Sequence, residues 1–169
     1  IAYTADDMEE VSCDDSAPAS AFVFKTVADP FVGKMSFIRV MSGVFKANSE
    51  YVNATTGETE KIGKLYSLCG KKQTEINSAN AGDICAAVKI SAATNDTLCG
   101  GKILSYDKIV FPKPCCKMAV KPKTQGDESK ISAAFARLTE EDPTLTFGQD
   151  KETGEFIIKV KGLHDGMNK

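Results

Sequence analysis

The stretch from Asp29 to Gly43 constrains the fold most, because two runs of β-forming residues meet there across a short turn. Side chains alternate with a period of two over residues 22–27 and again over 37–41, the pattern of β-strands. Pro30 fixes one backbone dihedral of the turn, and Gly33 permits a positive φ. The sequence therefore predicts a β-hairpin.

The chain continues to residue 111 as short candidate strands separated by turn residues at roughly ten-residue spacing, a pattern typical of a closed barrel or a sandwich. The candidate strands are 44–45, 51–53, 58–69 and 84–90. Gly63 lies inside the third of these and predicts a bulge or a close backbone approach. No helix is expected up to residue 111.

The pattern changes after residue 114. Residues 116–120 alternate as a strand with one wet face, and residues 127–141 take a helical period. The apolar stripe of this helix consists of Ile131, Ala134, Phe135 and Leu138. Strands are expected at 145–147 and 156–160, so this part is an α+β unit in which one helix is too few to cover the sheet.

The ends of the predicted helix carry their own signals. Asp127 or Ser129 can accept hydrogen bonds from the first free amides of the helix. Pro143 is expected to end it, because the proline ring excludes continuation.

Charge divides the chain unevenly. Six of its 23 acidic residues lie in the first 16 positions, which contain no Lys or Arg, so the remainder carries 17 acidic against 21 basic side chains, a net charge of +4. We expect an acidic leader over 1–18, a β-barrel over 19–112 and a partial α+β domain over 113–169. A mildly basic body is compatible with local contacts to a polyanion and equally with a solvated surface.

Six cysteines and one histidine do not form a metal site or a disulfide framework. Their spacings contain no Cys-x-x-Cys, and a zinc site needs clustered sulfur and imidazole ligands. We expect reduced thiols, with Cys85 and Cys116 buried in strands, and no disulfide between Cys115 and Cys116, because neighbours in a strand face opposite sides. We expect His164 to be an ordinary helix or loop residue. We also expect neither a membrane span nor a signal peptide.

Several motifs occur together in a characteristic order. They are Asp-Pro-Phe-Val-Gly-Lys at 29–34, Arg39-Val40, Ser42-Gly43, Asn-Ala-Gly-Asp-Ile at 80–84, Asp-Thr-Leu at 96–98, Lys-Pro-Lys at 121–123, Lys130, Leu138 and Glu-Glu-Asp-Pro at 140–143. In this order and spacing the chain resembles bacterial elongation factor G, or a paralogue of it, from about Ala19 to about Ile158. Tetracycline ribosomal-protection proteins and the type-3 release factor share the barrel more loosely.

The resemblance implies a β-barrel of the translation-factor domain II type followed by part of a ferredoxin-like α+β domain. It implies a cytoplasmic, non-catalytic part of a translocation GTPase, which docks on rRNA and protein of the small ribosomal subunit and couples the GTPase domain of the same parent chain to the outer domains. GTP and Mg would be cofactors of the parent. No Gly-x-x-x-x-Gly-Lys-Ser/Thr phosphate loop occurs in these 169 residues, so we expect this chain to need no cofactor and to catalyse no reaction.

The resemblance also singles out basic residues of the barrel as contacts to rRNA phosphates, which need only Lys and Arg at the right shape. The candidates are Lys34, Arg39, Lys46, Lys64, Lys71 and Lys72. The alternative for each is a surface charge with a buried stem. Lys117, Lys121, Lys123, Lys159 and Lys161 of the second part are weaker candidates.

Two departures from the family pattern lie at Met8-Glu9 and at Gly162-Leu163, where relatives carry more residues. With a first residue other than methionine, they lead us to expect a piece of a longer protein. The alternatives are a stand-alone ribosome-binding or RNA-binding module with the same barrel, and a fragment of a ribosomal-protection or release-factor-type translational GTPase.

Overall fold

The structure is a computed structural model that describes residues 1–4, 7–29, 31–70, 72–122 and 127–161. It contains two compact units, Ile1–Ile109 and Val110–Lys169, each described here by itself. The acidic leader belongs to the first unit. The break in the family pattern at Gly162-Leu163 and the residue His164 lie outside the described residues.

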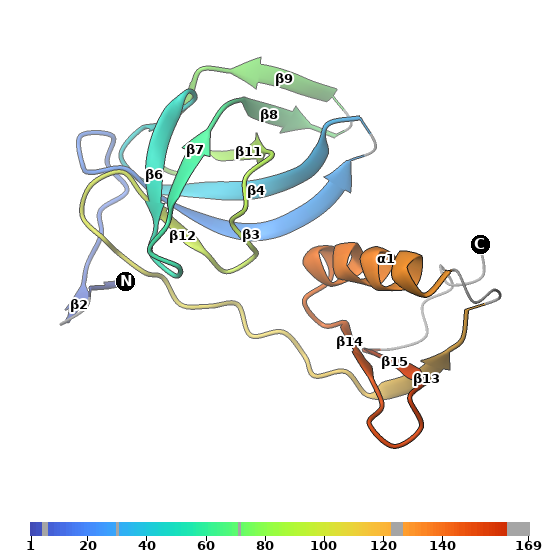
Figure 1. Ribbon diagram of the computed structural model, residues 1–169. Coiled ribbons are helices and arrows are strands. Elements are labelled where there is room, and N and C mark those ends of the chain that lie inside the picture. Colours follow the sequence, from blue (N-terminus) through green and yellow to red (C-terminus); the bar gives the residue numbers. More distant parts are fainter. Residues whose placement is uncertain (5–6, 30, 71, 123–126, 162–169) are drawn as a thin grey trace. The chain divides into compact units, whose positions relative to one another are not determined.

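An antiparallel sheet of eight strands forms the first unit (Figure 1). In spatial order the strands are β7 (Thr59–Ile62), β6 (Ser49–Asn53), β12 (Thr97–Cys99), β3 (Ser20–Asp29), β4 (Gly33–Ser42), β11 (Ile84–Val88), β8 (Leu65–Cys69) and β9 (Lys72–Ile76). Two small antiparallel pairs accompany it: β5 (Phe45–Lys46) with β10 (Ser78–Ala79), and β1 (Ala2–Tyr3) with β2 (Met8–Glu9).

The predicted hairpin lies at the centre of this sheet. β3 and β4 pair from Ser20↔Ser42 to Asp29↔Gly33, with two register shifts, one that skips Met41 of β4 and one that skips Phe24 of β3. Gly33 has φ +82°, as its place in the turn predicted, whereas Pro30 lies outside the described residues. The hairpin prediction is confirmed.

The core shows that the sheet curls around its own interior. Ile62 of β7 and Leu65 of β8, from distant places in the strand order, belong to one buried cluster with Ile38 of β4. Phe45 and Tyr51 stack in the same cluster with ring centroids 4.0 Å apart. A sheet curled around a shared core is a barrel, one of the two architectures that the strand spacing predicted.

The single strand predicted over 58–69 is wrong. The segment forms β7 and β8, which are interrupted at Gly63 and Lys64 and lie far apart in the sheet. Ile62 and Leu65 are both fully buried although they are three residues apart. An uninterrupted strand would place them on opposite faces, so the chain must break between them.

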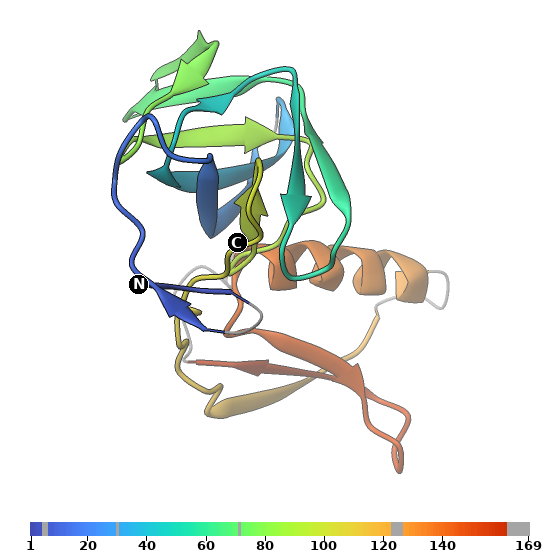
Figure 2. The same ribbon diagram turned by 90° about the vertical axis from the view of Figure 1, so that its left-hand side faces the viewer.

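The leader follows the outside of the barrel (Figure 2). The amide of Gly43 donates to the carbonyl of Asp14 (2.8 Å), and the amide of Ala81 donates to Oδ1 of Asp15 (2.8 Å). Ala2 is fully buried. These contacts hold described parts of the acidic segment against the barrel.

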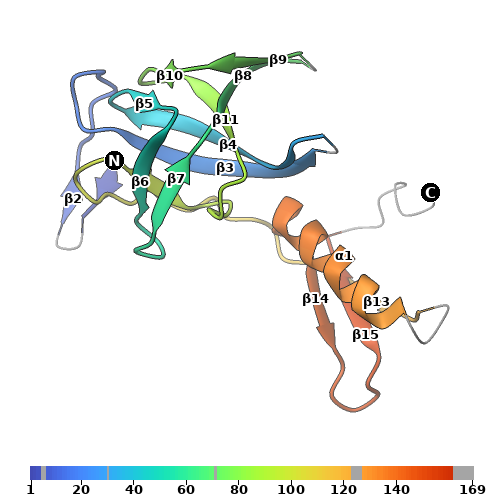
Figure 3. The ribbon, with the colours of Figure 1, turned by 45° about the horizontal axis from the view of Figure 1, so that its top comes forward.

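The second unit is a three-stranded antiparallel sheet with one helix. In spatial order the strands are β13 (Cys116–Val120), β15 (Phe156–Val160) and β14 (Thr146–Gln149), and α1 (Glu128–Glu141) lies over the sheet (Figure 3). Phe135 of α1 stacks on Phe147 of β14 with centroids 4.5 Å apart. The strand, helix and hairpin of the predicted α+β unit are confirmed, and with the barrel so is the predicted fold class.

The ends and the apolar face of α1 differ in part from what the sequence predicted. Asp127 makes no capping hydrogen bond through its side chain, and its carboxylate accepts a bond from Lys130 (2.8 Å) instead. The helix ends two residues before Pro143, as predicted. Leu138 is 43% exposed and Met118 41%, so one helix leaves part of the apolar face open. No helix among the described residues is long and apolar enough to cross a membrane.

The six cysteines are free thiols. Cys85 is fully buried as predicted, but Cys116 is only half-buried because β13 is an edge strand. The sulfurs of Cys115 and Cys116 lie 3.9 Å apart, contrary to the opposite faces we expected, because Cys115 precedes the strand. Within the described ranges no group of three His, Cys, Asp or Glu side chains could hold a metal ion.

Replacing Gly43 by alanine is expected to destabilise the barrel by roughly 2–4 kcal/mol, because a left-handed φ and a steric clash add together. Gly43 has φ +66°, and a Cβ there would lie 2.5 Å from the carbonyl oxygen of Ala17 and 2.6 Å from backbone atoms of Ala19. Gly57→Ala is the control, since φ is +75° but nothing lies within 4 Å of the added atom. Thermal unfolding of both variants measures how much stability each loses. The loss at Gly57 reports backbone strain alone, so an equal loss of stability at Gly43 would contradict the steric clash.

Cys85 is expected to resist thiol reagents in the folded protein. Burial raises its pKa to about 12, with the charge of Asp83 adding to the effect, so its reactive thiolate is scarce even in mild alkali. Because the unfolded thiol ionises near its usual pKa of about 8.5, stability should also fall above that pH. Titration with a chromogenic disulfide should label exposed Cys13, Cys69 and Cys115 first and Cys85 only on unfolding. Rapid labelling of Cys85 in the native chain would contradict its burial.

Candidate functional site

The turn of the β3–β4 hairpin is shaped by the side chain of Asp29. Its Oδ1 accepts hydrogen bonds from the amides of Phe31 (2.8 Å) and Val32 (3.0 Å), an Asx-type turn. Its Oδ2 accepts a bond from Nε2 of Gln73 in β9 (3.2 Å). The amides of Val32 and Phe31 lower the pKa of Asp29, with a smaller contribution from Gln73. The turn is thus fixed both internally and to the edge strand of the sheet.

A hollow of about 540 Å³ lies beside this turn. Residues from the turn, from the β7–β8 connection and from the end of β11 line it: Phe31, Val32, Lys61, Gly63, Lys64, Tyr66, Val88 and Lys89. We call it the hairpin-end hollow. Phe31 is 93% exposed, whereas Val88 is buried and forms part of a small apolar cluster with Met35 and Ala86. The hollow therefore combines an apolar wall with three ammonium groups.

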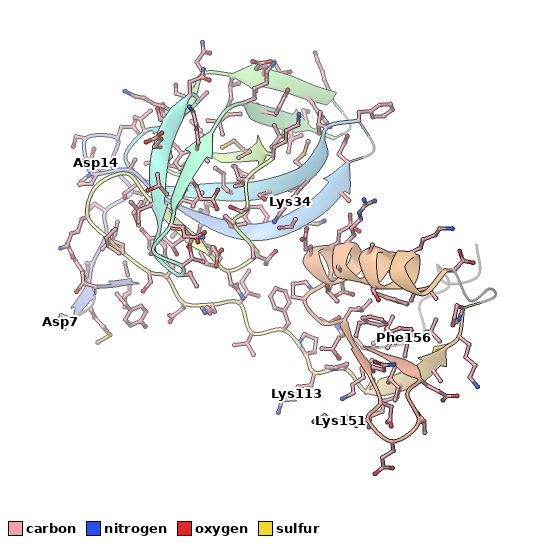
Figure 4. All side chains as sticks on the ribbon, viewed as in Figure 1. Asp7, Asp14, Lys34, Lys113, Lys151 and Phe156 are labelled. Carbon is pink, nitrogen blue, oxygen red and sulfur yellow. The ribbon has the colours of Figure 1, made fainter. Side chains whose placement is uncertain are left out.

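Three of the six predicted contact residues lie at this end of the barrel. Lys64 lines the hollow, and its ammonium group pairs with Glu75 at 2.9 Å. Lys34, at the start of β4, is half-buried and donates to the carbonyl of Ser91 (3.1 Å; labelled in Figure 4). Lys72 adjoins Gln73, which bonds to the turn.

Two other predicted contact residues, Arg39 and Lys46, lie away from this end of the barrel. Arg39 is exposed five residues after Lys34, about 17 Å along the strand at 3.3–3.4 Å per residue, and on the opposite face by alternation. It shares its face of β4 with Phe37 and Met41, as the alternation predicted. Lys46 is exposed in the separate β5–β10 pair. Lys71 lies outside the described residues.

Sequence reasoning missed Lys61 and Lys89. Lys61 alternates with buried Glu60 and Ile62 in β7, so strand periodicity was a usable signal for its exposure. Lys89 carried no such signal, because it leaves β11 with φ +59° and so departs from the strand pattern. Its amide donates to the carbonyl of Lys34 (3.0 Å), which connects the end of β11 to the base of the hairpin.

The electrostatics of the hollow favour an anion. Within the described part of the chain, no carboxylate forms an ion pair with Lys61 or Lys89, and only Lys64 is paired. The Lys64–Glu75 pair is more than half exposed on both sides, so water screens it and its contribution to stability is small. Three lysines beside an apolar wall can hold phosphate groups while a sugar or base lies against Phe31.

Two family models match consecutive parts of the chain. Elongation factor G domain 2 matches residues 18–101, and Elongation Factor G, domain III matches residues 111–164. The chain belongs to the elongation factor G family. The barrel thus corresponds to domain II of this family and the α+β unit to domain III.

A solved structure has a similar fold. The crystal structure of ttk003000868 from Thermus thermophilus is similar with a TM-score of 0.74 and 28% sequence identity. The similarity covers 86% of this chain and 22% of that chain. The chain thus spans about a fifth of the relative's length.

Replacing Asp29 by alanine is expected to loosen the hairpin turn in elongation factor G domain II, because it removes the acceptor of three hydrogen bonds. Asp29→Asn, which keeps an oxygen acceptor, is the control. Hydrogen exchange of the Phe31 and Val32 amides should accelerate several-fold in the alanine variant and change less in the control.

The same turn should respond to acid. The folded pKa of Asp29 is lowered, so its stabilising contribution is present above the unfolded value of about 3.9 and is lost as the pH falls through the folded value. Exchange at these amides, corrected for its intrinsic pH dependence, should therefore rise in that window for the native chain and not for Asp29→Ala. If the corrected exchange rates of the native chain did not change over this pH range, the role of the Asp29 carboxylate in holding the turn would be contradicted.

Proposed function

We propose that this chain is the non-catalytic middle part of a ribosomal translocation GTPase. In this proposal domain II docks the factor on the small ribosomal subunit, and domain III couples the GTPase domain to the outer domains during protein synthesis. The observation that carries the proposal is the match of two consecutive elongation factor G domains in their family order. The cation-lined hollow at the hairpin end supports the docking role.

The docking contact would be made to the phosphate backbone of rRNA. Structured RNA is recognised mainly by shape and backbone, and lysine is a suitable point charge for phosphate. Lys61, Lys64 and Lys89 form the proposed contact together with Lys34 and Lys72 around the hairpin turn. Arg39 and Lys46 remain proposed contacts of the same barrel at other places, and Lys71, which lies outside the described residues, remains a proposed contact.

Nucleotide chemistry is assigned elsewhere in the parent protein. A phosphate loop needs a glycine-rich turn followed by Lys and Ser or Thr at the head of a helix, and the 169 residues contain no such motif. We therefore propose that GTP and Mg bind the GTPase domain of the parent and that the complete factor works in the cytoplasm.

The expected behaviour of this chain is salt-sensitive binding to bacterial small ribosomal subunits without GTP turnover. Cosedimentation over a salt series measures the binding, and phosphate release from GTP measures the turnover. Because each lost phosphate contact reduces the slope of log K against log salt by about 1, Lys61→Gln/Lys64→Gln/Lys89→Gln should lower it by up to about 3.

A matched variant controls for net charge. Lys108→Gln/Lys113→Gln/Lys130→Gln removes the same charge from exposed residues outside the hairpin-end hollow and should bind almost as the native chain does. If both triple variants lost the same affinity for the small subunit, a contact at the hairpin-end hollow would be contradicted. Turnover above background would contradict the non-catalytic assignment, and salt-independent tight binding would contradict phosphate contacts.

A further inference from the structure

The sheet of domain III has an open face that α1 does not cover. In β15, Phe156, Ile158 and Val160 belong to the side that packs toward α1, so strand alternation places Ile157 and Lys159 on the other side. Lys117, Thr146 and Gly148 join them there through the strand register. Figure 4 shows Phe156 between the sheet and α1, and Lys151 on the side away from the helix.

Like charges stand opposite each other on this face. Lys117 of β13 pairs directly with Lys159 of β15, and Cβ atoms at such positions lie about 4.5–5.5 Å apart. Cross-strand pairs of equal charge destabilise a sheet, and among the described residues neither ammonium group has an ion-pair partner. Lys121, by contrast, pairs with Glu155 at 2.6 Å. The Lys117–Lys159 pair thus has no ion pair like that of its neighbour, although the carboxylate of Asp150 lies close enough to interact with the charge of Lys117.

These lysines surround a hollow of about 370 Å³. Its lining includes Lys117, Lys151, Lys159, Ile157 and Gly148. We call it the open-face hollow. A Cβ added at Gly148 would meet nothing within 4 Å, so the space above this residue is free.

One carboxylate also lines the open-face hollow. The amides of Thr153 (3.1 Å) and Glu152 (2.9 Å) donate hydrogen bonds to Oδ1 of Asp150 and lower its pKa, and the nearby charge of Lys117 lowers it further. Three ammonium groups against one engaged carboxylate leave the hollow positive.

The side chains of the open-face hollow suit phosphate groups. Its positive groups are lysines, which bind phosphate as point charges. The small residues Ala119 and Gly148 and the apolar Ile157 form a low floor that a sugar-phosphate backbone can approach. Phe147 also lines the hollow, but its ring stacks on Phe135 of α1 on the other side of the sheet, so base stacking is not part of the contact.

We propose that the open face of the β13–β15–β14 sheet is a second RNA-binding surface, in which Lys117, Lys151 and Lys159 bind phosphates of an RNA backbone independently of its sequence. This goes beyond the proposed function, which assigns RNA contact to the barrel. The two surfaces use different residues, so either contact can fail without the other.

Fluorescence anisotropy of a labelled RNA hairpin with the full 169-residue chain tests the proposal over roughly 50–200 mM salt. Lys117→Gln/Lys159→Gln should lower the slope of log K against log salt by about 2, one per phosphate contact. Gly148→Val keeps every charge and fills the open-face hollow, and its β-branched side chain suits an exposed strand. It should weaken RNA binding several-fold without lowering the melting temperature.

The control removes two equal charges from the covered side of the unit. Lys130→Gln/Arg137→Gln changes exposed residues of α1 and should leave the salt slope close to that of the native chain. The proposal is overturned if the control and Lys117→Gln/Lys159→Gln have the same slope, or if Gly148→Val binds RNA as the native chain does. It is also overturned if poly-glutamate displaces the RNA more effectively than unlabelled RNA does, since the surface would then prefer an acidic protein.

Discussion

The backbone hydrogen-bond ladder between β3 and β4 is the interaction on which the barrel depends. The two ten-residue strands pair along their whole length, and each also carries one half of the sheet, β12 on β3 and β11 on β4. Every other pair in this sheet is shorter. Asp29 and Gly33 set the turn, so the geometry of the hairpin determines where both halves of the barrel start.

Local periodicity predicted much of this fold because burial in strands and in an amphipathic helix repeats at fixed intervals. It located the hairpin, the helix up to Glu141 and the final β-hairpin. It did not predict which strands pair, because β7 and β8 are neighbours in sequence and yet far apart in the sheet. The break at Gly63 was missed although buried Ile62 and Leu65, three residues apart, contain the signal.

The candidate site was less predictable because it is made by tertiary structure. The three lysines that line the hollow meet only after the barrel forms. Lys61 belongs to β7, Lys64 to the β7–β8 connection, and Lys89 follows β11 with a positive φ. Sequence reasoning found Lys64 at this site, together with nearby Lys34 and Lys72, but grouped them with Arg39 and Lys46, which lie elsewhere. In domain III, the strand register separated the weaker candidates: Lys117 and Lys159 face each other, whereas Lys121 is neutralised by Glu155.

The close approach at Gly43 also has a mechanical consequence. The leader is attached at the end of β4 by two bonds, Gly43 amide to Asp14 carbonyl and Ser42 Oγ to Pro18 carbonyl. Tension applied to the chain just before Asp14 would load the Gly43–Asp14 bond first, then the Ala81–Asp15 bond and the Ser42–Pro18 bond, before it reached β3 through the covalent chain. The glycine is therefore an anchor point through which a pull on the leader becomes a shear force on the centre of the barrel.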